Sequence, residues 1–202
     1  MSSIVSICNR ALTKLGANRI TSLDDNVKGA RVMSSMYDSV RRAEIRSHRW
    51  SFALARTSLP ALSAAPAWGF KLQYQLPADF LRLDQLEMIF AWFGDLYRWS
   101  SANFDTALYA VEGGKILTNL PAPLNVRYAR DINDPNLFDA TFEESLACKL
   151  AIEACEDLTQ SSTKKGDVKA EYDDAIKSAI RVNAIERPPQ QLAESEWIIA
   201  RL

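Results

Sequence analysis

Acidic residues stand in adjacent pairs in the second half of the chain, and such pairs are the first candidates for catalysis. Glu143 with Glu144 and Asp173 with Asp174 are two of these pairs. Two carboxyl groups can serve as the general acid and the nucleophile or base of a glycoside hydrolase. Both pairs fall in segments with helical spacing, where neighbouring side chains point about 100° apart and carboxylates near a helix N-terminus favour its dipole. We therefore predict no catalytic residues, and a cell-wall hydrolase remains an alternative.

Histidine and cysteine, the usual ligands of zinc, are few and scattered along the chain. His48 is the single histidine, and the three cysteines are Cys8, Cys148 and Cys155. Zinc sites and Cys-His catalysis need clustered ligands, and the sequence has neither a glycine-rich phosphate loop nor a nucleophile elbow. We expect a structural or surface histidine, buried free thiols of a reducing compartment, no metal and no cofactor. A disulfide or a metal site is the alternative for the thiols.

Positive charge is concentrated near the start of the chain. Residues 1–50 carry 9 Lys and Arg against 4 Asp and Glu, whereas residues 131–202 carry 8 against 15. Drawn on a helical wheel, the basic residues of the second predicted helix fall largely in one arc opposite its apolar face. This stripe can contact DNA phosphates, pair with acidic helices within or between subunits, or simply be solvated. The residues that we predict for subunit contact or for a DNA channel are Lys28, Arg31, Arg41, Arg42, Arg46 and Arg49.

Apolar residues at helical spacing predict four helices, two towards each end of the chain. The first ends at Gly16, where glycine suits a left-handed cap, and the second lasts until about His48. A capping box of Thr141 and Glu144 starts the third, which is apolar nearly all round and is expected to lie among the others. The stretch "SSTKKGD" predicts a loop, after which the fourth helix ends ahead of Pro188.

Residues 51–130 change to short alternating runs that predict strands. In "YAVEGGKILTNL" the Gly113-Gly114 pair supplies the positive φ angles of a hairpin turn, and "APLNVRY" predicts a closing strand. In "LQYQLPADFLRL" the alternation of leucine and tyrosine with Gln73 and Gln75 predicts a half-buried strand. Pro77 ends that strand, either as a capped sheet edge or as an ordinary tight connection.

The order of these elements predicts an α+β fold. Residues 1–50 and 131–187 supply the two halves of an antiparallel α-helical bundle, residues 51–130 form an inserted small β-sandwich or barrel-like domain, and residues 188–202 form an extended C-terminal arm. Trp197, Ile198 and Ile199 give the arm an apolar anchor for docking on a partner, and folding back onto the bundle is the alternative. Arg10 and Lys14 interrupt the apolar N-terminal pattern, so we expect neither a signal peptide nor a membrane span.

Three stretches carry a resemblance to a known family. They are "YQLPADFLRL", "VEGGKILTNLPAPLNVRYARDINDPNLFDATFEESLACKLA" and the C-terminal "ESEWIIARL". With the order of elements around them, they resemble the head-to-tail adaptor proteins of short-tailed bacteriophages, the tail tubular protein A family. These motifs are structural and mark no active site. The resemblance implies a helical bundle with an inserted β domain.

The resemblance also implies a function. In that family about twelve copies form a cyclic ring beneath the portal protein. The ring continues the DNA channel towards a tail nozzle resembling tail tubular protein B. We therefore expect a non-enzymatic virion protein of the neck, assembled in the host cytoplasm, whose arm docks on the portal or on an adjacent subunit. A sequence-independent DNA-binding module that uses the basic stripe is the alternative.

Overall fold

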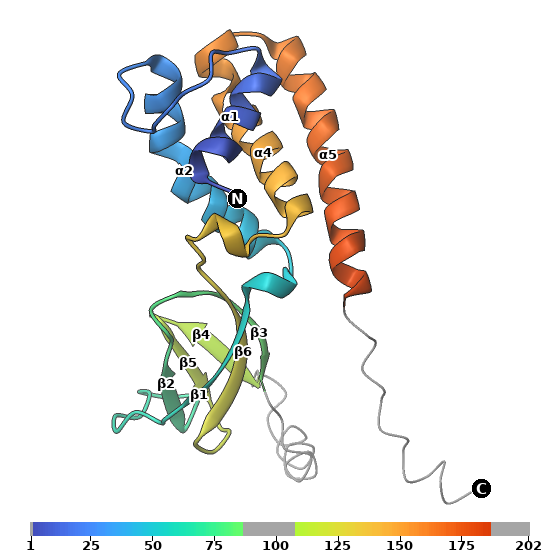
Figure 1. The fold of residues 1–202 in the computed structure, drawn as a ribbon. Helices are drawn as coiled ribbons and strands as arrows, with labels where there is room; N and C mark the ends of the chain where they lie inside the picture. The colour runs from blue at the N-terminus through green and yellow to red at the C-terminus, as the bar shows by residue number, and fades with distance from the viewer. Residues whose placement is uncertain (1, 87–107, 187–202) are drawn as a thin grey trace, which may run out of the picture.

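The structure is a computed structural model that describes residues 2–86 and 108–186. Within these ranges the chain is a mixed α+β protein with four α-helices and two three-stranded antiparallel sheets. Figure 1 shows the helices packed together at one end and the strands gathered at the other. The helices are α1 (Ile4–Leu15), α2 (Lys28–Ser47), α4 (Ala140–Thr159) and α5 (Ser162–Ile185). The coarse α+β prediction is therefore confirmed.

Both helices predicted in the first fifty residues are confirmed. Ser3 caps the start of α1, and Gly16 ends it at a φ of +72°, the left-handed conformation that glycine adopts without strain. The turn that follows is held against α1 by Asn9. Its side-chain amide donates to the carbonyl of Ile20 and accepts from the Ile20 N–H, both at 2.8 Å. These bonds fix the direction in which the chain approaches α2.

Helix α4 begins earlier than its predicted capping box, so that detail of the prediction is wrong. Asp139 is the cap, and its carboxylate accepts from the backbone N–H of Thr141 at 2.7 Å. A carboxylate satisfies the free N–H groups of a first turn and also interacts favourably with the helix dipole. Glu144 does not bond back to the helix start and instead lies 2.7 Å from the Lys14 ammonium of α1.

The predicted loop "SSTKKGD" is also wrong, because it forms the first turns of α5. Gln160, at a φ of +51°, ends α4. Ser161 then caps α5 by accepting from the Lys164 N–H at 3.3 Å. Lys165 reaches back to Glu156 of α4 at 2.6 Å across this tight connection. Polar residues and a glycine suggested a loop, but side-chain capping and tertiary packing override such weak propensities.

The apolar face of each helix is buried against α4, which contacts α1, α2 and α5. Its nearly all-round apolar surface thus has partners on several sides, as its sequence predicted. Where the helices meet the strands, Trp50 is fully buried with its ring 4.9 Å from that of Phe142 and with its Nε1 donating to the Glu44 carbonyl at 3.0 Å. One core therefore draws residues from both ends of the chain, from Ile7 to Ala53 and from Ile132 to Ala179, with Leu81 of the strands.

The strands form two sheets, here called sheet A and sheet B. Sheet A has the order β1 (Leu54–Leu59), β6 (Leu124–Arg130), β3 (Phe80–Leu86), and sheet B has the order β2 (Leu72–Gln75), β5 (Lys115–Thr118), β4 (Tyr109–Glu112). All pairs are antiparallel. A second core lies between them and includes Leu59, Tyr74, Ile116, Val126 and Tyr128. The strand predictions at residues 72–75, 109–118 and 124–130 are confirmed.

Turn residues account for the paths between strands. Gly113 and Gly114, at φ of +55° and +74°, close the β4–β5 hairpin as predicted. Pro77 stands where the chain leaves sheet B and enters sheet A, and its carbonyl accepts from the Phe80 N–H at 3.1 Å. The predicted half-buried pattern of β2 is wrong at Gln73, which is buried and donates to the Ala64 carbonyl at 2.8 Å. A covering loop, invisible to the alternation, removes that side chain from water.

Candidate functional site

The structure separates the six basic residues predicted for subunit or DNA contact into different environments. Arg41 is 2% exposed, so the prediction that it lines an outer surface is wrong. Its guanidinium binds the Asp131 carboxylate and the Ile132 carbonyl, and it lies 3.3 Å from Asp38. The spacing in the sequence already indicates that Arg41 is buried, because it follows the buried Tyr37 by four residues and therefore shares its face of the helix.

Two more of the six are bound within the chain near the second helical half. The Lys28 ammonium donates to the carbonyl of Asp157 in the last turn of α4. The Arg42 Nε lies 3.2 Å from Asp131, although the side chain is 57% exposed. Arg31 is exposed, and among residues 2–86 and 108–186 its side chain has no hydrogen-bond or ion-pair partner. The expected pairing of the basic first segment with acidic groups of the second half thus occurs within one chain.

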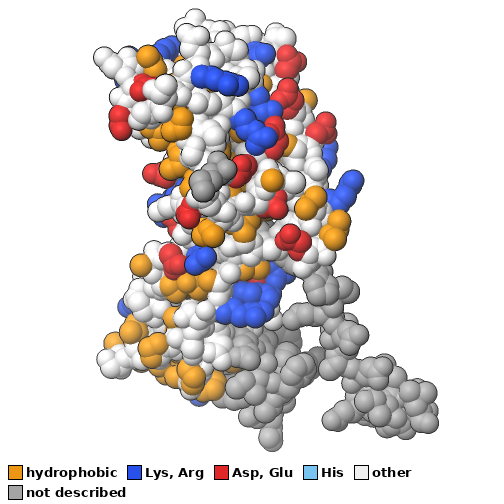
Figure 2. All heavy atoms as spheres, viewed as in Figure 1, with side chains coloured by type: hydrophobic (Ala, Val, Ile, Leu, Met, Phe, Trp, Pro, Cys, Tyr) orange, Lys and Arg blue, Asp and Glu red, His pale blue; other side chains and the backbone are white. Residues whose placement is uncertain are grey.

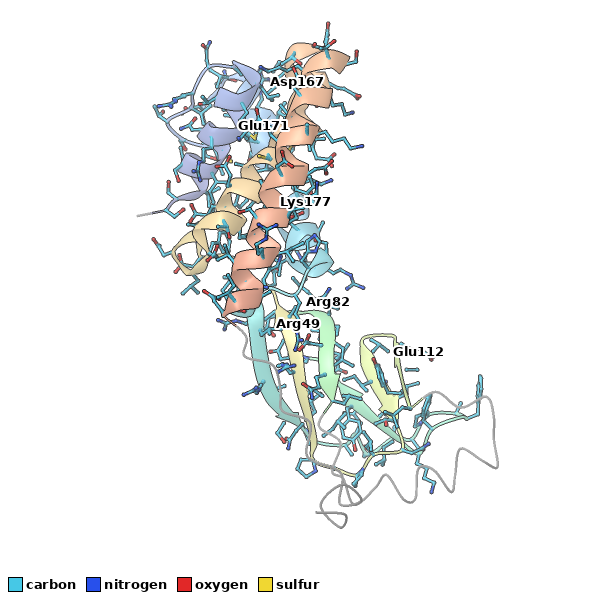
Figure 3. The ribbon with its side chains drawn as sticks, turned by 90° about the vertical axis from the view of Figure 1, so that its right-hand side faces the viewer. Arg49, Arg82, Glu112, Asp167, Glu171 and Lys177 are labelled. Carbon is cyan, nitrogen blue, oxygen red and sulfur yellow. The ribbon has the colours of Figure 1, made fainter. Side chains whose placement is uncertain are left out.

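The last two of the six, Arg46 and Arg49, lie at the junction between α2 and sheet A. Arg46 donates to the carbonyl of Leu81 in β3. In return, Arg82 of β3 donates to the carbonyls of Ser47 and His48 at 3.3 and 2.9 Å, groups that a helix end leaves without partners. Figure 3 shows Arg49 and Arg82 close together where the helices meet the strands. These arginines therefore hold the strands against the helix end.

A single carboxylate organises the rest of this junction. Asp84, whose side chain is 6% exposed, lies in β3 where the register with β6 shifts between Leu83 and Gln85. It binds Arg49 at 2.6 Å and Arg127 of β6 at 2.5 Å. Such register irregularities re-aim side chains, and this one places a carboxylate between two guanidinium groups. The sequence analysis missed Arg82 and Arg127, because their strands have no grouping of basic residues like the one on α2.

Large apolar side chains are exposed at several places in the described residues, Val27 and Leu137 among them, and two unlike places stand out. At the far end of the strands, Trp68 is 87% exposed beside a groove of about 460 Å³, lined by residues 66–70 and the β4–β5 hairpin. In the last turns of α5, Ile180, Val182 and Ile185 are exposed. Figure 2 shows hydrophobic side chains gathered along the lower edge of the strands, away from the helices. Large exposed apolar side chains in groups indicate contact sites for other molecules.

The acidic pairs considered for catalysis have different surroundings in the structure. Glu144 lines a hollow of about 430 Å³ with Arg10, Lys14 and Arg19. Burial by itself would raise the pKa of Glu144, but the hydrogen bond and the charge of Lys14, with the charge of Arg10, lower it below its ordinary value. Asp173 and Asp174 are exposed on α5 and are not among the residues lining this hollow. An ion-paired carboxylate of low pKa is poorly suited to act as a general acid.

The thiols and the histidine occupy structural positions. Cys8, Cys148 and Cys155 are free and buried, which confirms the predicted buried thiols, and burial raises the pKa of Cys8 to about 12. His48 is half-buried with its ring 5.8 Å from that of Trp50, and its pKa is lowered by burial and by the charge of Arg82. In the described part of the chain, no three His, Cys, Asp or Glu residues are grouped as metal ligands would be.

Two further predictions concern the membrane and the arm. None of the helices in the described residues is long and apolar enough to cross a membrane. Trp197, Ile198 and Ile199, predicted to anchor the C-terminal arm, lie outside the described residues, as does the rest of segment 188–202. Comparison with known proteins finds neither a family model nor a curated protein that matches this chain.

Proposed function

We propose that the protein is a structural head-to-tail adaptor of a bacteriophage virion. In this proposal the helices of both chain ends form an antiparallel bundle that carries the strands as an inserted β domain, and about twelve copies close into a ring. The ring joins the portal protein to a tail nozzle and continues the channel through which double-stranded DNA passes. The protein has no enzymatic role, and its C-terminal arm docks on the portal or on a neighbouring copy.

The observation that carries this proposal is the pair of unlike apolar surfaces. A cyclic ring of more than two copies uses heterologous contacts, in which one surface of a subunit meets a different surface of the next. The Trp68 groove among the strands and the exposed Val182 and Ile185 at the end of α5 are two such different surfaces. Tryptophan is also the residue most enriched at the energetic centres of protein interfaces. A chain that only bound a small ligand would need neither surface.

The internal ion pairs refine how subunits are expected to meet. The predicted basic stripe is largely used inside the chain, by Arg41 and Arg42 at Asp131 and by Lys28 at the end of α4. Complementary charge on neighbouring copies therefore contributes less than we expected from sequence. We assign the main contact energy to the apolar surfaces, with exposed charge setting orientation.

Sedimentation with purified portal protein tests the adaptor proposal. The full chain is expected to sediment as a monomer or loose oligomer alone and as a ring-sized complex when portal is added. Trp68→Ser should weaken the complex without unfolding the chain, because Trp68 is almost wholly exposed. Lys169→Ser, at an exposed position of α5 away from its last turns, is the control and should sediment as the unaltered protein does. Absence of any complex with portal over a wide concentration range would refute the proposal.

A further inference from the structure

A connection of two residues, Gln160 and Ser161, joins α4 to α5. Gln160 has a φ of +51° and a ψ of 30°, and it is the one residue other than glycine with a positive φ in the described part of the chain. This left-handed conformation is strained for a residue that carries a Cβ atom. Opening the turn between the two helices would therefore release a conformational cost.

An open connection can also satisfy the helix ends. The last carbonyls of α4 and the first N–H groups of α5 have no partners within their own helices. If residues 160 and 161 became helical, α4 and α5 would form one continuous helix in which these groups bond to each other. The closed turn has the Lys165–Glu156 ion pair in its favour, but both side chains are exposed, and such pairs contribute little to stability.

Helix α5 is the outermost helix, and few of its side chains are buried. Figure 1 shows it along the outer side of the helical half, beside α4. Of its 24 residues, all in the described part of the chain, Val168, Ile176 and Ala179 are buried, whereas α4 buries nine of its 20. Elements with few buried apolar contacts separate from a fold most readily. The helix can therefore leave its place while α1, α2 and α4 keep most of the core between them.

The place that α5 occupies is defined by groups of all three other helices. It packs mainly on α4, while Glu171 lies 3.0 Å from Lys14 of α1 and Tyr172 donates to Glu44 of α2 at 3.1 Å. Near its end, Asn183 bonds to the backbone that follows α2, at 2.6 and 2.7 Å. A second copy of the chain presents the same groups in the same arrangement. The α5 of another copy therefore fits this place as well as the chain's own α5 does.

We propose that copies of this chain exchange α5, so that the helix of one copy packs on α1, α2 and α4 of another. Such domain swapping links identical chains without a new interface, and short strained hinges favour it. Exchange between two copies closes a dimer, and passing α5 from each copy to the next closes a ring. Exchange of α5 goes beyond the adaptor proposal, because it requires neither a portal nor the exposed apolar surfaces.

Cross-linking between isotopically light and heavy copies tests the exchange. The full chain is prepared in both forms, mixed in equal amounts, and unfolded and refolded together at high concentration, and monomer and oligomer are separated by size exclusion. A zero-length carbodiimide then joins ammonium and carboxylate groups that are in contact, and mass spectrometry identifies the isotopes of each joined peptide pair. Lys14 supplies both the assay and its control, since it lies 3.0 Å from Glu171 of α5 and 2.7 Å from Glu144 of α4.

The two cross-links of Lys14 should behave differently in the oligomer. About half of its Lys14–Glu171 pairs should combine light and heavy peptides, because the exchanging copies meet at random. The Lys14–Glu144 pairs should stay within one copy, and so should both pairs in the monomer. Unmixed Lys14–Glu171 pairs in the oligomer would overturn the proposal, and so would equal mixing of both pairs or the absence of any oligomer after concentrated refolding.

Two substitutions at the hinge give a matched comparison. Gln160→Gly removes the strain of the closed turn, whereas Gln160→Ala keeps that strain and favours a continuous helix. The dissociation constant of the exchanged dimer should be higher for Gln160→Gly by about fivefold for each hinge, or roughly twenty-five-fold for two. Circular dichroism checks that both variants are folded, and equal dissociation constants would contradict the role of the hinge.

Portal binding separates this test from that of the adaptor. A portal complex whose Lys14–Glu171 pairs all stay unmixed would refute the exchange and leave the adaptor proposal standing. Mixed pairs in an oligomer that does not sediment with portal would refute the adaptor proposal alone.

Discussion

The buried ion pair between α2 and the segment after β6 gives an asymmetric prediction for stability. Arg41 is 2% exposed, whereas the side chain of Asp131 is 21% exposed and also lies 3.2 Å from Arg42. Removing Asp131 leaves a buried guanidinium with only the Ile132 carbonyl and the exposed Asp38 as acceptors. Breaking a buried pair in this way costs about 3–5 kcal/mol. We expect Asp131→Ala to lie near the lower end of that range, because Asp38 remains.

Removing the other partner should destabilise less. Arg41→Met keeps most of the buried volume and leaves Asp131 in contact with water and with Arg42, so we expect a loss of about 1–2 kcal/mol. Arg42→Met removes a half-exposed pair with the same carboxylate and should cost less than about 1 kcal/mol. The order of losses is therefore Asp131→Ala, then Arg41→Met, then Arg42→Met. The asymmetry follows from burial alone, since the same carboxylate is involved each time.

Urea unfolding followed by tryptophan fluorescence measures these differences, because Trp50 reports on the same junction. The unfolding slopes of the three variants should agree, so that shifts in midpoint convert directly to free energy. Equal losses of unfolding free energy for Arg41→Met and Asp131→Ala would refute the reasoning, because the cost would then not depend on which charge remains buried. A loss below about 1 kcal/mol for Asp131→Ala would refute the assigned burial of Arg41.

Three further outcomes are expected. Gly114→Ala should destabilise the protein by about 1 kcal/mol because of its φ of +74°, whereas Gly166→Ala, in α5 with open space at its Cβ position, should stabilise it by about 0.5–1 kcal/mol; urea midpoints compare the two. Burial raises the pKa of Glu44 despite the hydrogen bond from Tyr172 and the charge of Lys149, so its contribution to stability is lost as pH rises through that raised pKa. Glu44→Gln should make the melting temperature depend less on pH just above the ordinary glutamate pKa, and an unchanged dependence on pH would contradict this. Phe142→Ala should lower the unfolding free energy by about 3–5 kcal/mol, measured in urea, because the ring is fully buried against Trp50.

The sequence predicted the elements better than their ends. Helical spacing located α1, α2 and α4, and the glycine pair located the β4–β5 hairpin, because these signals are local. The start of α4 was wrong because Asp139 competes successfully with Thr141 for the free N–H groups. The start of α5 was wrong because composition suggested a loop where capping by Ser161 and packing on α4 favour a helix.

The candidate surfaces were harder to predict, for a different reason. The sequence identified α2 as basic, yet we predicted the same contact role for Arg41 and Arg42, whose side chains are 2% and 57% exposed. Period-two alternation places Arg56 and Arg127 on outer faces of their strands, but only the register brings them opposite each other. That register joins residues 71 positions apart in sequence, and no local pattern carries it.

The internal pairs also explain how a nearly neutral chain comes to have charged surfaces. Lys14 binds Glu144 and Glu171, and Arg41 binds Asp131, so much of the charge contrast between the two ends of the sequence is cancelled inside the molecule. Figure 3 shows Asp167 and Glu171 far along α5 from Arg49 and Arg82 at the junction, with Lys177 on α5 between them. Along α5 itself both signs occur, with Lys164, Lys165, Lys169, Lys177 and Arg181 beside Asp167, Glu171, Asp173 and Asp174. The local charge at the junction is thus set by which groups the fold brings together there, and the net charge of −1 by itself does not reveal it.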